Sequence, residues 1–120
     1  MKESPIVEKS RRFAVRIVHA YRQIAETRKE FVLSKQILRS GTSIGANIAE
    51  AEGAFGMKDF ASKMVIAHKE CLETLYWLKL LSETGFLEQD DFASLHADCD
   101  ELRKILASII ITTREKMDLK

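Results

Sequence analysis

Small residues recur at every fourth position in the middle of the chain. They are Gly41, Gly45, Ala49 and Gly53. On a helix this spacing places all four on one side, where a row with almost no side chains lets another helix approach closely. Glycine inside a helix costs about 0.5–1 kcal/mol relative to alanine, so the two central glycines indicate a compensating contact. The row predicts a tightly packed helix. We favour a contact within one subunit, and a contact between subunits is the alternative.

A row of polar residues lies beside the small ones. Ser43, Asn47 and Glu50 fall at i, i+4 and i+7. We interpret them as a structural polar motif that fixes helix register, with Glu50 paired to a base, because an unpaired buried charge is costly. Arg39 is the nearest base along the same helix, and another helix is an equal source. A ligand or catalytic pocket is the less favoured reading, since no second carboxylate or nucleophile–base pair lies nearby in the sequence.

The rest of the chain is organised in four long apolar-periodic segments. With one proline and five glycines in 120 residues, few tight turns are available, which argues against an all-β fold. The periodicity predicts a single all-α domain over residues 1–120, an antiparallel up-down-up-down four-helix bundle. The expected helices cover residues 5–26, 30–53, 57–84 and 88–115. The sequence leaves the first residue of the second helix open, because Thr27–Glu30 has a capping-box pattern and a start near Leu33 fits equally well.

The third predicted helix carries more apolar residues than one face requires. A core stripe runs from Phe60 to Leu78, and Val65, Leu72 and Tyr76 are interpreted as a second core stripe beside it. Two further apolar residues lie off both stripes, on one side of the helix. They are Ile66 and Trp77. This pair is a candidate oligomer interface or the edge of the core, and the sequence does not decide between the two.

Charge is unevenly distributed although the net charge is only +1. Residues 1–39 hold ten Lys and Arg against four Asp and Glu, so the first predicted helix displays a basic face. Its candidate nucleic-acid-binding residues are Arg11, Arg12, Arg16 and Arg22. A solvated surface is the commoner explanation of such a face, and no aromatic residue is interleaved with the arginines to stack on bases.

Cysteine and histidine placement indicates neither a metal site nor a cofactor. The three histidines are far apart, and Cys71 and Cys99 both fall on apolar stripes, as expected of buried free thiols. The N-terminal residues lack an apolar leader core, and the apolar run at 105–113 is too short to span a bilayer. We therefore expect a cytoplasmic protein without a membrane partner.

The central stretch resembles a known family. Residues 43–50 read Ser-Ile-Gly-Ala-Asn-Ile-Ala-Glu, which is similar to the Ser-Ile-x-x-Asn-Ile-Ala-Glu signature of the bacterial 23S rRNA-intervening-sequence proteins. Other stretches also fit this family: Arg39–Thr42, Asp59–Phe60, Ile66–Ala67 and Glu73. The likeness covers nearly the whole chain and implies a four-helix bundle that assembles as a ring-like homopentamer. A related branch, the accessory variability determinant of diversity-generating retroelements, is strongly basic and binds a reverse transcriptase and nucleic acid.

Three hypotheses of function follow. The first is a non-enzymatic homo-oligomer, pentameric by the family likeness, that serves as an assembly or docking scaffold for a protein or nucleoprotein partner. The second is an accessory factor that binds RNA or DNA through the basic face of the first helix. The third, an enzyme with a site at Asn47 and Glu50, is disfavoured because the sequence offers no complete acid–base or metal constellation.

Overall fold

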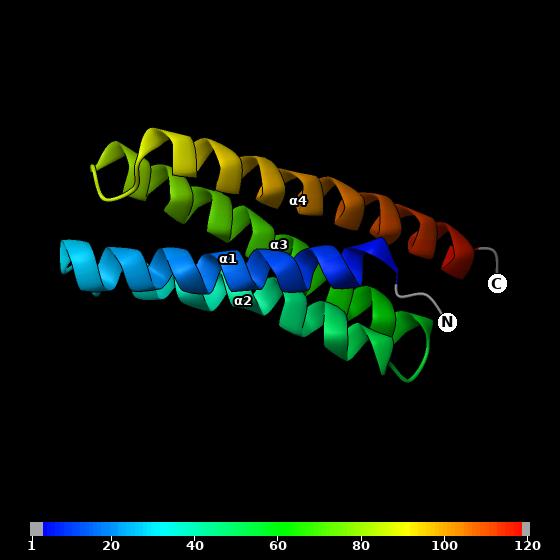
Figure 1. The fold of residues 1–120 in the computed structure, drawn as a ribbon. Helices are drawn as coiled ribbons and strands as arrows, with labels where there is room; N and C mark the ends of the chain where they lie inside the picture. The colour runs from blue at the N-terminus through cyan, green and yellow to red at the C-terminus, as the bar shows by residue number, and fades with distance from the viewer. Residues whose placement is uncertain (1–3, 119–120) are drawn as a thin grey trace.

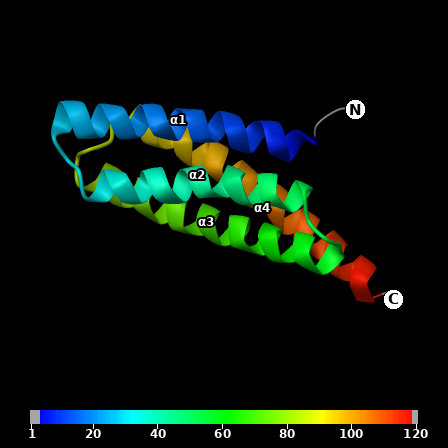
Figure 2. The same ribbon diagram turned by 90° about the horizontal axis from the view of Figure 1, so that it is seen from below.

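Four antiparallel helices make up the molecule in a computed structural model that describes residues 4–118. They are α1 (Pro5–Arg28), α2 (Leu33–Glu52), α3 (Met57–Glu83) and α4 (Gln89–Asp118). The bundle is elongated, 52 × 24 × 23 Å, and the start of α1, the α2–α3 turn and the end of α4 lie at the same end (Figures 1 and 2). The predicted all-α four-helix bundle is confirmed. Residues 1–3 and 119–120, including most of the N-terminal segment in which we expected no leader, lie outside the described residues.

The second helix begins at Leu33 and not at residue 30. Glu30 precedes the helix, and its carboxylate accepts hydrogen bonds from the backbone N–H groups of Val32, Leu33 and Ser34 at 3.1, 3.0 and 2.7 Å. These are three of the N–H groups that the start of a helix leaves without an intrahelical partner. The capping-box interpretation of Thr27–Glu30 is therefore wrong, and Glu30 itself caps α2. At the other margins α1 continues to Arg28 and α4 to Asp118.

All four helices contribute to one apolar core along the axis. Its largest fully buried side chains include Phe13 and Ile17 from α1, Ile37, Ile44 and Ile48 from α2, Leu78 and Leu81 from α3, and Leu102 and Leu106 from α4. The two cysteines are buried free thiols, as predicted. Among the described residues, every buried side-chain nitrogen or oxygen has a hydrogen-bond partner.

The second core stripe predicted for α3 does not lie in the core. Leu72 is 49% exposed and Tyr76 is 61% exposed, while Val65 is half-buried at the edge. α3 packs against α2 on one side and α4 on the other, and the core stripe already fills the angle between these neighbours. A second stripe therefore turns toward solvent. The outward surface of α3 is unusually apolar as a consequence.

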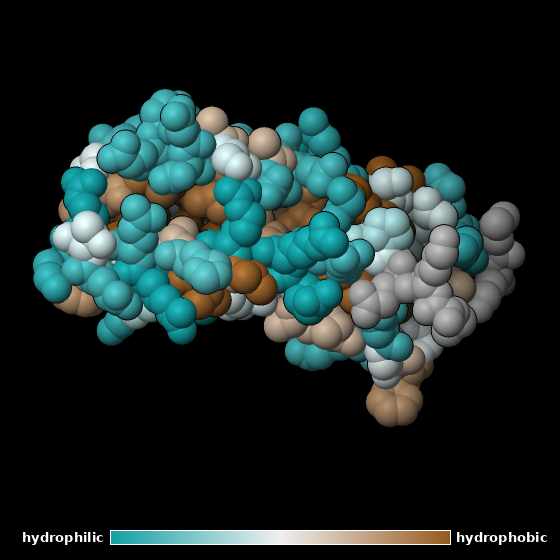
Figure 3. Space-filling view, viewed as in Figure 1, coloured by the Kyte–Doolittle hydropathy of each residue, from teal (hydrophilic) through white to brown (hydrophobic). Residues whose placement is uncertain are grey.

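The seam between α1 and α4 is the loosest of the four contacts between neighbouring helices. Surface ion pairs span it, Lys9 with Glu101 at 3.1 Å and Arg16 with Asp98 at 2.5 Å. Figure 3 shows apolar side chains between the hydrophilic ones on this face. Exposed ion pairs stabilise such a contact only weakly, so α1 is held mainly by its packing on α2.

Candidate subunit and partner interface

The polar motif of α2 runs along its border with α3. Ser43 Oγ donates to the carbonyl of Arg39 at 2.6 Å, and Asn47 Nδ2 donates to the carbonyl of Ser43 at 2.8 Å. Both acceptors lie in the same helix, so the hydrogen bonds of these two side chains require no partner from another helix. Asn47 is half-buried and Glu50 is exposed. The three residues form a polar edge along the helix.

Glu50 pairs with a base from the next helix. Its carboxylate lies 3.0 Å from Lys63 Nζ on α3. The hydrogen bond and the negative charge of Glu50 raise the pKa of Lys63 above its ordinary value. The expected partner is thus supplied across the α2–α3 border, although Glu50 is not buried.

A second polar cluster lies farther along the same border. Arg39 of α2 pairs with Glu70 of α3 at 3.3 Å and also with Glu73. Glu73 in turn accepts a hydrogen bond from Trp77 Nε1 at 2.9 Å, and the Tyr76 ring meets the Trp77 ring edge to face at 5.0 Å. Arg39 and the α3 glutamates therefore hold the tryptophan in a fixed orientation beside solvent.

Ile66 and Trp77 lie next to these clusters. Ile66 is 39% exposed, whereas Trp77 is half-buried and packs partly against the core. They are eleven positions apart, about three helical turns, and so share one side of α3. The structure brings this apolar pair and the polar motif of α2 onto one outer surface, which the sequence alone did not connect.

The row of small residues divides into two halves. A Cβ on Gly41 would lie 2.7 Å from Ile17 Cγ1 of α1, and a Cβ on Gly45 would lie 3.3 Å from the carbonyl oxygen of Ser10. At these two positions α1 and α2 approach within one subunit. Ala49 and Gly53 are exposed, and the only atom near an added Cβ on Gly53 is a backbone oxygen of its own turn.

The four candidate arginines of α1 are not equivalent. Arg12 pairs with Glu8 at 2.6 Å, and Arg16 bonds to Asp98 and, at 2.9 Å, to Ser94. Arg11 and Arg22 share one side of α1 and have no ion pair among the described residues. Two of the four guanidinium groups are thus already engaged, which reduces the charge available to a phosphate backbone.

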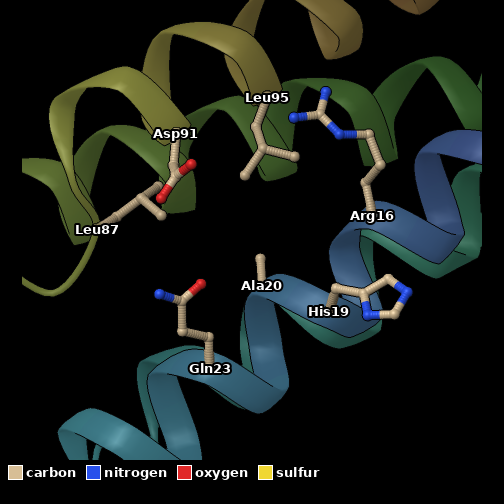
Figure 4. A pocket seen from close by; sticks show the side chains of 7 residues that line it. All are labelled: Arg16, His19, Ala20, Gln23, Leu87, Asp91 and Leu95. Atoms are coloured by element: carbon tan, nitrogen blue, oxygen red, sulfur yellow. The ribbon is translucent and has the colours of Figure 1, made fainter.

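One hollow beside α1 is open and is lined by both polar and apolar side chains. It has a volume of about 260 Å³ and is lined by side chains of α1 and of the start of α4 (Figure 4), namely Arg16, His19, Ala20, Gln23, Leu87, Asp91 and Leu95. Arg16 is already bonded to α4, and no hydrogen bond joins His19 to Asp91 within the part of the chain that the structure describes. The hollow therefore holds no nucleophile–base or acid–base pair.

Each shifted pKa has a structural cause. The hydrogen bond from Arg103 lowers the pKa of Asp100, and partial burial followed by the charge of Arg103 lowers the pKa of His68. The hydrogen bond to Cys71 and burial raise the pKa of the Cys99 thiol. Within residues 4–118 no group of three or more His, Cys, Asp or Glu side chains could hold a metal ion. No described helix has the length and apolar character needed to cross a membrane.

Sequence reasoning missed two exposed apolar features. Phe55, in the α2–α3 turn, is 99% exposed. An apolar groove of about 350 Å³ lies between α3 and α4, where Leu72 and Ile111 are both exposed. The signal for the groove was present in α3, whose apolar residues exceed what one core face can bury.

Comparison with known proteins decides the family. The family model described as 23S rRNA-intervening sequence protein matches residues 2–108. The chain belongs to this family. No protein with a curated description matches the chain significantly.

A solved structure is similar to this family member along almost its whole length. It is a protein with unknown function from the S23 ribosomal protein family of Bacteroides thetaiotaomicron VPI-5482. The two chains are 52% identical with a TM-score of 0.86, and the match covers 88% of this chain and 97% of the other.

Proposed function

We propose that this member of the 23S rRNA-intervening sequence protein family is a non-enzymatic homo-oligomeric scaffold that docks a protein or nucleoprotein partner. The observation that carries the proposal is the apolar outward surface of α3, where Ile66, Leu72 and Tyr76 are exposed beside the half-buried Trp77. Exposed apolar surface that includes aromatic side chains is typical of protein interfaces. The family likeness implies five copies.

The polar groups around this surface suit a subunit interface. Arg39, Glu70 and Glu73 form an ordered charged cluster at one end, and Glu50 with Lys63 forms another. An apolar centre with charged groups at its margin is the usual anatomy of a protein–protein contact. The absence of an acid–base pair from the hollow beside α1 supports a scaffold over an enzyme.

Substitution of Ile66 tests the subunit interface. Ile66→Asp places a charge on the α3 surface, and we expect it to raise the dissociation constant of the oligomer at least about tenfold, because a desolvated unpaired charge costs well over 1.4 kcal/mol. Sedimentation velocity and light scattering measure the effect. The parent is expected at a multiple of 13.7 kDa, five by the family likeness.

Val15→Asp is the matched control, since Val15 is 50% exposed on the outward side of α1. It should leave the oligomer mass unchanged. A parent protein that stays monomeric at all concentrations would exclude the scaffold proposal.

The accessory nucleic-acid-binding function is the alternative outcome of the same study. Labelled RNA and DNA are titrated with the parent and with an Arg11→Ala, Arg22→Ala double variant, which removes the two candidate arginines of α1 that have no ion pair among the described residues. Binding that falls steeply with salt and is lost in the double variant would favour that function over a purely protein-docking role.

A further inference from the structure

Phe55 is held in a defined turn that turns its ring outward. Its backbone N–H donates to Asp59 Oδ2 at 3.1 Å, and the N–H of Ala54 donates to the carbonyl of Ala51 at 3.1 Å. Gly56 follows at φ 121°, a conformation that L side chains rarely adopt. The ring is 99% exposed although the backbone beneath it is well bonded. Phe55 is therefore an exposed apolar side chain on a backbone turn whose conformation is fixed by hydrogen bonds.

The α3–α4 groove is a complementary apolar depression. It measures about 350 Å³ and has both apolar and basic side chains in its lining. The apolar ones include Val65, Leu72, Ile110 and Ile111, and the basic ones include Lys69 and Arg114. The lining contains no acidic side chain.

A chain cannot fill this groove with its own Phe55. The groove residues of α3 begin at Val65, eight positions after the helix starts at Met57, which is about 12 Å along the axis. The ring of Phe55 also contacts almost nothing of its own subunit. We propose that Phe55 of one copy inserts into the α3–α4 groove of a second copy. This inference rests on the homo-oligomer of the proposed function and adds a second contact, which meets the proposed α3 surface at Leu72.

Two turns of the molecule carry exposed apolar side chains, and we call them its tips: the α2–α3 turn with Phe55 and the α1–α2 turn with Phe31. Charge favours the Phe55 tip as the one that enters the groove. Phe31 and Val32 are also exposed, but residues 28–35 contain three bases and one acid. Residues 50–59, around Phe55, contain three acids and one base, and one of these acids, Glu50, is already paired with Lys63. Glu52 and Asp59 still outnumber Lys58, so a groove lined by Lys69 and Arg114 attracts this tip and repels the basic one.

The contact joins two different surfaces, so it is heterologous. The tip lies at one end of the bundle, and the groove lies on its side, farther along α3 and α4. Repetition of such a contact closes into a ring when the rotation between copies permits and otherwise forms an open chain. A two-fold dimer that pairs one patch with itself is not expected.

Cross-linking and substitution at the two tips test the inference. A photoreactive benzoylphenylalanine at position 55 should cross-link to residues 65–72 or 107–114 of another copy, identified by mass spectrometry with one copy isotopically labelled. Phe55→Ala should raise the dissociation constant at least about tenfold, the size expected of a hot-spot aromatic residue. Phe31→Ala, the matched control, should change it less than about twofold.

A mixing experiment tests the head-to-tail geometry. Phe55→Ala keeps the groove and loses the ring, whereas Leu72→Asp keeps the ring and blocks the groove. Each variant alone should have a raised dissociation constant, and mixing the two should restore one tip-to-groove contact in each one-to-one pair.

Cross-links that map only to other residues, or an unchanged dissociation constant for Phe55→Ala, would overturn the inference. If the parent were still oligomeric in that case, the proposed function would stand. A monomeric parent would overturn both.

Discussion

At the scale of single residues, Glu30 has the most specific local role. The three backbone N–H groups that it accepts fix the start of α2, and Ser34 Oγ returns a bond to the Glu30 carbonyl at 2.6 Å. Partial burial raises the pKa of Glu30, but the hydrogen bonds from Leu33, Ser34 and Val32 together lower it below its ordinary value. The sequence left two starts open, one at the Thr27–Glu30 capping-box pattern and one near Leu33, and the structure confirms the start at Leu33 with Glu30 just before the helix.

Removing the Glu30 carboxylate should destabilise the protein. We expect Glu30→Ala to lower the free energy of unfolding by about 1 kcal/mol, the usual effect of losing a helix cap. Because the folded-state pKa is lowered, the stabilisation is present above the unfolded-state pKa of about 4.3 and is lost as the pH falls through the folded-state value. Urea unfolding at about pH 7 and about pH 3 measures both effects.

Glu26→Ala is the control, since Glu26 is exposed on α1 without an ion pair among the described residues. Equal losses for the two variants at neutral pH would contradict the capping role of Glu30.

At the scale of helices, the row of small residues sets the distance between α1 and α2. Gly41 faces the fully buried side chain of Ile17, and Gly45 faces the backbone at Ser10. The periodicity predicted a close approach but not its partner, because a row on one helix does not say which neighbour it meets. Gly53, in the same row, has left the helix and lies in the turn.

Alanine substitutions should change the stability of the protein differently at the two ends of this row. In Gly41→Ala, the clash with Ile17 outweighs the gain in helix propensity, and we expect a net loss of about 1–2 kcal/mol. Gly53→Ala meets open space at φ −100°, so it should be neutral or stabilise by up to about 1 kcal/mol. Thermal unfolding of both variants at one protein concentration checks this, and a Gly41→Ala variant as stable as the parent would exclude a tight contact there.

At the scale of the whole molecule, packing of α3 on α4 shields both cysteines. Cys71 and Cys99 are fully buried, and Cys99 Sγ lies 3.5 Å from the carbonyl of Cys71. A thiol whose pKa is raised by its partner thiol and by burial stays protonated, and the thiolate is the reactive form. Reaction of these thiols therefore requires the helices to separate.

Thiol labelling measures that separation. We expect neither native cysteine to react with a disulfide reagent in buffer and both to react on unfolding in urea. Ser108→Cys, at an exposed position on α4, should react at once and is the positive control. Rapid labelling of the folded parent would mean that α3 and α4 open far more readily than their packing indicates.

The sequence by itself determined the class of fold, the four helices and the burial of both cysteines, because these follow from apolar periodicity along one chain. It also located the polar motif and the glycine row. Only the tertiary structure decided that Lys63 pairs with Glu50, that Ile17 meets Gly41, and that Leu72 and Tyr76 face outward. These outcomes depend on which helix lies beside which and at what angle. A helix with two apolar stripes does not reveal which one its neighbours will cover.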